Sequence, residues 1–169
     1  NHINNQNSYQ QKTDDISVIP SLAMLHFDIS LEEIMLAILN KKTLLLFDEE
    51  SLSNPKYINN QFLQYSVDFF TTTPSIFNYL WENGASQSLK NLKIIVLGGE
   101  VLTKNVAKII LENTNSKLYN SYGPTETTIA VTSIQITDYN NIPIGKQHDN
   151  TNIIISNNLF VGGHTAIWV

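Results

Sequence analysis

Apolar runs of strand length alternate with segments of helical spacing along most of this chain, and this alternation restricts the possible folds more than any other feature. The stretch Leu92–Glu100 contains a continuous apolar run, as expected for a strand buried on both faces, and a helical segment follows at Thr103–Asn113. Short connections join such segments. We therefore expect βαβ units with right-handed crossovers, and so an α/β fold in which a mostly parallel β-sheet is flanked by helices.

The other predicted elements extend this pattern without a repeat or a linker. Strands are expected in SVIPSLAMLHF (one strand or two extended pieces), TLLLFD, SVDFFTTT, KLYNSY, TTIAVTSIQI and NIIIS. Helices are expected over about residues 55–65 and in SIFNYLWEN, which Gly84 would close. A further helix is expected in SLEEIMLAILN, where apolar residues recur at helical spacing at Leu31, Ile34, Met35, Ile38 and Leu39.

Composition excludes several classes of protein. A chain of 169 residues, 42% of them hydrophobic, suits one globular domain, and without cysteine it forms no disulfides. A net charge of −5 with no arginine argues against a nucleic-acid partner. No apolar run approaches the roughly 20 residues that span a bilayer, and the Asn/Gln-rich residues 1–15 lack the apolar core of a signal peptide. We therefore expect a cytoplasmic protein with no membrane partner, whose residues 1–15 form a polar, mobile start.

Loops beyond the carboxyl ends of parallel strands are the candidate ligand sites, because ligands bind there in such sheets. In the loop after the first predicted strand, Ser30 suits a helix N-cap and Glu33 would complete a capping box. Asp28 is left without a structural role, although spacing alone favours a structural interpretation of this loop.

Two more loops at this edge have structural interpretations. Helix capping by Thr73 before Pro74, together with β-propensity, accounts for the run of threonines at Thr71–Thr73. The pair Gly98-Gly99 allows either a positive φ or close approach of a ligand, so a simple turn and a binding role both remain open there. This pair belongs to neither a GxGxxG motif nor a Walker loop.

The stretch Tyr122-Gly123-Pro124-Thr125-Glu126 contains more functional groups than a turn requires. An aromatic face can stack on a purine, glycine permits close approach and a threonine hydroxyl can donate to a phosphate. A carboxylate beside phosphates is a usual protein ligand of Mg²⁺. These residue types favour nucleotide binding over a plain turn.

The same stretch carries a family resemblance. NSYGPTETT resembles the Asn-x-Tyr-Gly-Pro-Thr-Glu motif of the amino-acid adenylation domains of nonribosomal peptide synthetases, which belong to the adenylate-forming ligase superfamily. FDIS, LGGE, IPIGK and LFVGG resemble further segments of these domains, in the same order. The resemblance implies that residues 16–169 form a partial adenylation (AMP-binding) domain, within the large N-terminal subdomain of an adenylate-forming enzyme.

The resemblance also implies roles for individual residues. Tyr122 would stack on adenine, Asn120 would bond its exocyclic amine, and Asp28 would pair with the α-ammonium group of an amino acid. Thr125 and Glu126 would be catalytic, Thr125 at the α-phosphate and Glu126 as the Mg²⁺ ligand. The full set implied for the ATP site is Gly98, Gly99, Glu100, Asn120, Ser121, Tyr122, Gly123 and Thr125.

A pocket for the substrate side chain is implied as well. Its members would be Asp28 with Ile29, Glu32, Thr71, Ile95, Leu97, Ser121, Ile129 and Ala130. Glu32 would favour a cationic side chain such as that of ornithine or lysine, but it could equally be a solvated helix residue. Leu97 is bulky where small residues are common, so the pocket would be short or no longer functional.

The implied reaction is formation of an aminoacyl adenylate from ATP, followed by transfer to the phosphopantetheine thiol of a peptidyl carrier protein in secondary metabolite biosynthesis. The family's phosphate loop, ribose-binding Asp and C-terminal lysine have no counterpart in this sequence. We therefore expect these residues alone to be inactive. The alternatives are a fragment of an acyl- or aryl-CoA ligase, which would not need Asp28, and a catalytically dead nucleotide-binding or interaction module.

Overall fold

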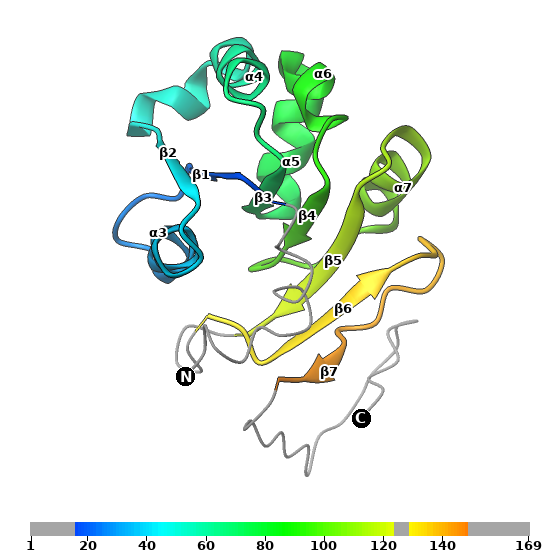
Figure 1. The fold of residues 1–169 in the computed structure, drawn as a ribbon. Helices are drawn as coiled ribbons and strands as arrows, with labels where there is room; N and C mark the ends of the chain where they lie inside the picture. Colours follow the sequence, from blue (N-terminus) through cyan, green and yellow to red (C-terminus); the bar gives the residue numbers. More distant parts are fainter. Residues whose placement is uncertain (1–15, 124–128, 149–169) are drawn as a thin grey trace.

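A twisted sheet of five strands forms the centre of the structure, a computed structural model that describes residues 16–123 and 129–148 (Figure 1). The strand order is β3-β4-β5-β6-β7. The first three of these strands are parallel, as predicted, whereas β6 and β7 run antiparallel to their neighbours. Their bounds are β3 Phe69–Thr72, β4 Ile94–Leu97, β5 Lys117–Tyr122, β6 Thr132–Ile136 and β7 Lys146–Gln147.

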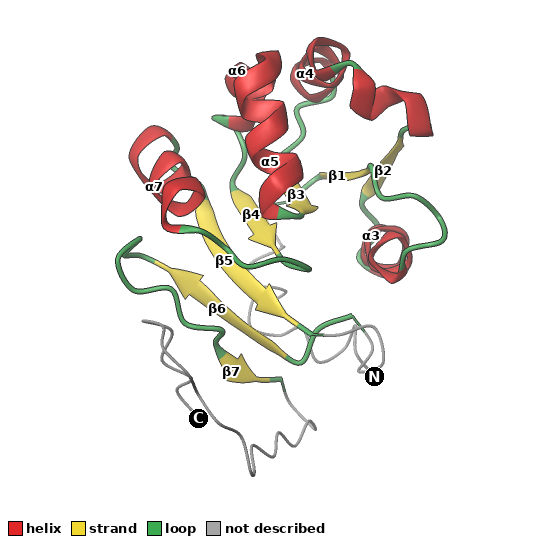
Figure 2. Ribbon diagram, turned by 180° about the vertical axis from the view of Figure 1, so that it is seen from behind, coloured by secondary structure: helices red, strands yellow, loops and turns green. Residues whose placement is uncertain are grey.

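A second, parallel pair of strands lies beside β3 in both ribbon views (Figures 1 and 2). It consists of β1 (Val18–Ser21) and β2 (Thr43–Leu46). Asp68, at the start of β3, connects the two sheets. Its buried carboxylate accepts hydrogen bonds from the backbone N–H groups of Ser17, at 3.0 and 3.1 Å, and of Val18, at 3.3 Å.

Helices connect the parallel strands, and side-chain caps begin several of them. Thr73 accepts a hydrogen bond from the Ile76 N–H at 3.3 Å just before Pro74, which confirms the predicted cap. Thr103 caps the last helix in the same way. The helices are α3 (Asp28–Leu39), α4 (Pro55–Gln64), α5 (Pro74–Leu80), α6 (Ser86–Leu89) and α7 (Lys104–Asn113), with a 3-10 turn at Glu49–Ser53 and a kink at Trp81–Ala85 between α5 and α6. Among the described residues, no helix is long and apolar enough to cross a membrane.

The core lies on both faces of the sheet, because successive strand residues point to opposite sides. On one face, Phe70, Ile95 and Leu97 pack with side chains from α4 to α7. On the other face, Phe69 and Val96 belong to a smaller cluster that contains side chains of β1 and α3. Burial on both faces explains why these strands are continuous apolar runs without polar alternation.

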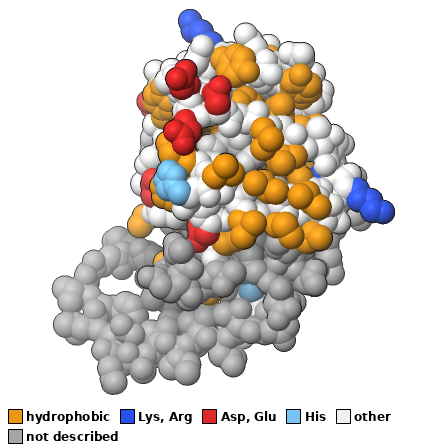
Figure 3. Space-filling model, turned by 90° about the vertical axis from the view of Figure 1, so that its left-hand side faces the viewer, with side chains coloured by type: hydrophobic (Ala, Val, Ile, Leu, Met, Phe, Trp, Pro, Cys, Tyr) orange, Lys and Arg blue, Asp and Glu red, His pale blue; other side chains and the backbone are white. Residues whose placement is uncertain are grey.

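The face that α3 buries differs from the one its apolar spacing suggests. Leu31 and Ile38 are 58% and 61% exposed, whereas Leu36 is 1% exposed. Polar residues accompany Leu36 on the buried face, namely Ser30, Glu32 and Glu33. Figure 3 shows the outer surface on the side of the molecule where α3 lies, and hydrophobic side chains gather there. Helical spacing thus predicted the helix correctly, but contacts with β1 select the side that is covered.

Substitutions on these two faces should have very different effects on stability. In this chain, we expect Ile38→Gln to change the free energy of unfolding by less than about 0.5 kcal/mol, because the side chain is already in water. Leu36→Gln should cost about 3 kcal/mol or more, since it removes buried methyl groups and buries an amide. Urea unfolding followed by circular dichroism measures both. Similar losses for the two variants would show that Ile38 is covered in solution.

Candidate functional site

The carboxyl ends of the parallel strands meet at one edge, as the sequence predicted. Thr72 of β3 pairs with Leu97 of β4, and Leu97 pairs with Asn120 of β5. The Gly98 N–H then donates to the Thr72 carbonyl at 3.1 Å, which extends the ladder by one residue. Residues predicted separately from the loops after β4 and β5 are therefore neighbours in the structure.

Gly98 and Gly99 follow β4, and glycine is favoured at each of them for a different structural reason. A Cβ atom on Gly98 would lie 3.0 Å from the Ser121 carbonyl oxygen and 3.4 Å from Ser121 Cβ, so a larger residue would push β4 and β5 apart. Gly99 has a φ of +77°, a conformation that favours glycine. Together they bring the backbone of this loop close to the end of β5. The sequence had left a turn and a binding role open here. The φ of Gly99 accounts for a turn, and the binding role stays a prediction.

Glu100 follows this glycine pair and contacts the start of α5. Its carboxylate accepts hydrogen bonds from the Ser75 N–H at 3.2 Å and from the Ser75 hydroxyl. The carboxylate therefore ties the β4–α7 loop to the first turn of α5. This contact provides a structural role for a residue that the family resemblance assigns to the ATP site.

The end of β5 presents one buried and one exposed side chain. Asn120 is buried, and its Nδ2 donates to the Pro143 carbonyl at 2.8 Å. Tyr122 is 51% exposed. Ser121, between them, is half-buried. The Pro143 contact also draws the IPIGK segment toward this edge.

The loop between β5 and β6 is closed at its base by tight backbone packing. A Cβ on Gly123 would lie only 2.5 Å from Ala130 Cα, so only glycine fits against the returning chain. The Val131 N–H donates to the Tyr122 carbonyl at 2.9 Å. Ile129 has a φ of +70°, which is strained for a β-branched residue. The predicted residues Thr125 and Glu126 lie outside the described residues.

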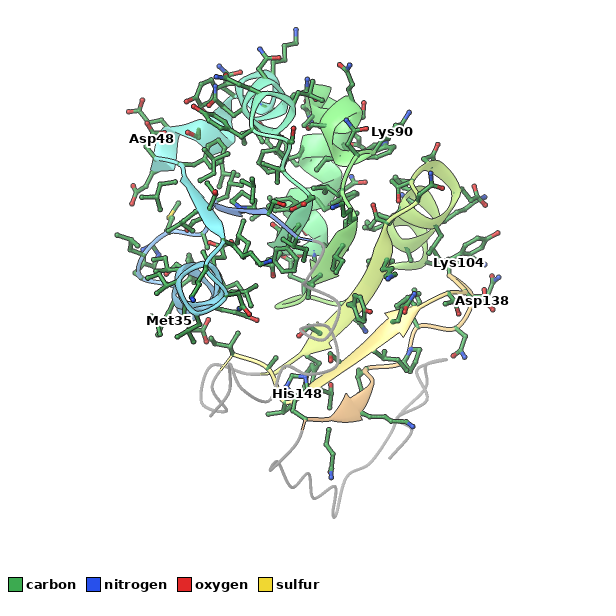
Figure 4. The ribbon with its side chains drawn as sticks, in the orientation of Figure 1. Met35, Asp48, Lys90, Lys104, Asp138 and His148 are labelled. Carbon is green, nitrogen blue, oxygen red and sulfur yellow. The ribbon has the colours of Figure 1, made fainter. Side chains whose placement is uncertain are left out.

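His148 was not predicted as part of this region and is buried beside β6 (Figure 4). Its ring Nε2 lies 3.1 Å from the Ser133 hydroxyl oxygen. Its backbone N–H donates to the Val131 carbonyl at 2.8 Å. Ser133 in turn pairs with Ser121 across the sheet. His148 thus braces the strand behind the candidate site. Its sequence neighbourhood carried no signal for this role.

Asp28 is the first residue of α3 and is half-buried. The capping box predicted for Ser30 and Glu33 is wrong. Phe27 occupies the N-cap position, without a side-chain cap, and the Ser30 hydroxyl donates to the Phe27 carbonyl at 2.7 Å. Glu33 does not reach back to the helix start, because it is buried against β1.

Glu33 is a buried acid whose role sequence reasoning missed. Its Oε2 accepts hydrogen bonds from the Ser21 hydroxyl at 2.9 Å and from the Ala23 N–H at 3.4 Å. Burial raises the pKa of Glu33 to about 7, and neighbouring Glu32 adds to this rise, while the bond from Ser21 opposes it. The signal available in the sequence was spacing, since Glu33 lies three residues after Ser30 and three before Leu36 on the buried face.

Most members of the predicted side-chain pocket are buried. Ile95 and Leu97 are fully buried in the cluster that faces α4 to α7. Glu32 is 5% exposed, so the alternative of a solvated helix residue is wrong. Thr71 and Ala130 are also buried, whereas Ile29 and Ile129 are half-buried.

Within residues 16–123 and 129–148, no group of three or more His, Cys, Asp or Glu side chains could hold a metal ion. The metal ligand predicted from the sequence, Glu126, is not among these residues.

Comparisons with known proteins agree on one family. A model of the family described as AMP-binding enzyme matches residues 1–160. The D-alanine–D-alanyl carrier protein ligase of Staphylococcus epidermidis is 36% identical over 139 residues, which are 78% of this chain and 29% of the ligase. The chain therefore spans less than a third of the length of this relative.

Solved structures share the fold. A four-domain nonribosomal peptide synthetase bound to AMP and glycine has a TM-score of 0.72 at 23% identity, over 87% of this chain and 11% of that one. The Vibrio cholerae adenylation domain AlmE, in complex with glycyl-adenosine-5′-phosphate, has a TM-score of 0.66 at 22% identity, over 85% and 29%. The α/β fold described above is thus that of the N-terminal subdomain of adenylate-forming enzymes.

Proposed function

We propose, because the chain belongs to the family of AMP-binding enzymes, that it is part of an ATP-dependent ligase that activates an amino acid as its adenylate. The finer assignment is an adenylation domain of a nonribosomal peptide synthetase in secondary metabolite biosynthesis. The activated amino acid would pass to the phosphopantetheine thiol of a peptidyl carrier protein, in the cytoplasm. A relative named as a D-alanyl carrier protein ligase supports a substrate and a partner of this kind.

The observation that carries the proposal is the convergence at the carboxyl edge of the sheet. Gly98 lies against Ser121, and Asn120 and Tyr122 end the adjoining strand. Ligands of parallel α/β sheets bind at this edge.

These residues fit an adenosine group. The exposed ring of Tyr122 offers a face on which adenine can stack, and Asn120 is fixed by its bond to Pro143 for contact with the base edge. The glycine backbone at Gly98 and Gly99 adds no side chain that would occupy the site. Thr125 would contact the α-phosphate, and Glu126 would hold Mg²⁺, which offsets negative charge on the phosphates when bound.

The amino acid would bind between this edge and α3. Asp28 would accept hydrogen bonds from the α-ammonium group and orient the carboxylate toward the α-phosphorus of ATP. Attack of a carboxylate oxygen forms the acyl–phosphate bond as pyrophosphate leaves, so the protein mainly aligns the reactants. Buried Glu32, one turn after Asp28, favours a cationic side chain such as that of ornithine or lysine.

Amino-acid-dependent exchange of labelled pyrophosphate into ATP tests this function in a longer ligase that contains the chain. We expect exchange with one amino acid of a panel that includes ornithine, lysine, glycine and D-alanine. The 169-residue chain should show negligible exchange, because the family's phosphate loop and C-terminal lysine, which would offset phosphate charge, have no counterpart in its sequence. Exchange driven only by acids without an amino group would replace the proposal with an acyl- or aryl-CoA ligase. Nucleotide binding without any exchange would indicate a catalytically dead module.

A further inference from the structure

We propose that Glu33 is a positioning residue for the amino-acid end of the site, because it holds the loop that leads from β1 to Asp28. The inference rests on the proposed function, in which Asp28 binds the α-ammonium group. Glu33 itself touches neither reactant. It would act on the reaction only through the position of Asp28.

One end of this loop is tied directly to Glu33. The side chain is 1% exposed and reaches from the buried face of α3 to the carboxyl end of β1. There Oε2 accepts hydrogen bonds from the hydroxyl of Ser21, the last residue of β1, and from the backbone of Ala23 in the loop. A shift of the loop away from α3 would therefore leave a buried carboxyl group without these donors.

The other end of the loop is tied to the same helix. Ser30 donates to the Phe27 carbonyl from both its hydroxyl, at 2.7 Å, and its N–H, at 3.1 Å. Inside the loop, the Phe27 N–H donates to the Met24 carbonyl at 2.9 Å. Asp28 follows Phe27 directly. The path of the chain into Asp28 is thus set by two buried polar side chains of α3, of which Glu33 alone ionises.

The protonation state of Glu33 changes the strength of this tie. A carboxylate accepts hydrogen bonds about twice as strong as those to a neutral group. Burial places the pKa of Glu33 at about 7, and Glu32 is the charged group that contributes to the rise. The β1 side presents only uncharged groups to it, namely the Ser21 hydroxyl and the backbone of Leu22 and Ala23. The loop should therefore be held more firmly above neutral pH.

The stability of the folded chain changes with pH in the opposite direction, because it falls as the pH rises. Because the pKa in the folded chain lies above the ordinary value of 4.5, the protonated form favours folding. The contribution of Glu33 to stability is therefore fully present below pH 4.5 and is lost as the pH rises through about 7. A glutamine at this position would avoid this loss of stability. The glutamate therefore strengthens the hydrogen bonds to the loop above neutral pH but lowers the free energy of unfolding there.

Kinetics of a longer ligase that contains the chain test the inference. In the wild type, we expect KM for the amino acid to fall about fivefold from pH 6 to pH 8 while KM for ATP stays constant. Glu33→Gln should keep the higher KM at every pH. Ser21→Ala should move the midpoint upward, because it removes a hydrogen bond that lowers the pKa of Glu33. Glu112→Gln, at an exposed position of α7, is the matched control and should behave as the wild type. A wild-type pH profile of KM in Glu33→Gln would overturn the inference.

A second measurement on the 169-residue chain is independent of activity. At pH 8, Glu33→Gln should raise the hydrogen-exchange rates of the Leu22 and Ala23 amides several-fold relative to the wild type. It should also reduce the difference in Tm between pH 5 and pH 8. Unchanged exchange at both amides would overturn the inference. If the wild-type ligase showed no amino-acid-dependent exchange of pyrophosphate, the proposed function would fall, and the amide exchange rates would still decide whether Glu33 holds the loop.

Discussion

Replacing Asp28 by asparagine is expected to lower kcat/KM for the amino acid by about a hundredfold or more in a ligase that contains this chain. Asparagine keeps the size of the side chain but removes the charge that would face the α-ammonium group. A desolvated ammonium group without its carboxylate costs about 2–5 kcal/mol. Most of the loss should appear in KM for the amino acid, and KM for ATP should change less than about twofold.

Two controls separate this effect from a general loss of structure. Asp28 is half-buried in the first turn of α3, where no side chain caps the helix, so Asp28→Asn should change the free energy of unfolding by less than about 1 kcal/mol. Glu50→Gln, at an exposed position far along the chain, should leave the kinetics unchanged. An unaltered KM for the amino acid in Asp28→Asn would show that this carboxylate does not bind the substrate, as expected of an acyl-CoA ligase.

Replacing Asp68 by alanine is expected to lower the free energy of unfolding of this chain by about 3 kcal/mol or more. The reason is that one buried carboxylate satisfies the backbone N–H groups of Ser17 and Val18 at the junction between the two sheets. Without it, the buried Val18 N–H and the partly buried Ser17 N–H would lose their acceptor. Urea unfolding gives the loss, and hydrogen exchange at Ser17 and Val18 locates it.

The ion pair between Lys93 and the Asp68 carboxylate should contribute much less to the free energy of unfolding. Lys93 Nζ lies 3.3 Å from Asp68 Oδ2, but the lysine side chain is 54% exposed. Lys93→Ala should therefore cost less than about 1 kcal/mol, and Asp68→Asn, which keeps one acceptor oxygen, should lie between the two. A loss in Lys93→Ala as large as that in Asp68→Ala would assign the stabilisation to the ion pair and not to the backbone contacts.

The candidate site was predicted unevenly from sequence. The loops after β4 and β5 were singled out because they follow parallel strands and because Tyr122, Thr125 and Glu126 offer more functional groups than a turn requires. The structure does bring Gly98 against Ser121. The loop before Asp28 was misinterpreted, since a Ser-x-x-Glu spacing satisfies the pattern of a capping box. The hydrogen-bond partners of Glu33 depend on how α3 packs against β1, which spacing within the helix does not specify.

The sequence by itself determined the order of most of the elements, the βαβ character of the sheet and the cap at Thr73. These features need only neighbours along the chain, such as a hydroxyl three residues before an N–H group or an apolar run long enough for a strand. Only the tertiary structure decided that the polar side of α3 is buried and that Glu33 accepts a hydrogen bond from Ser21 of β1. It also decided that β6 and β7 run antiparallel to their neighbours. Burial depends on which surfaces meet, and spacing within one helix cannot specify the surface that packs against it.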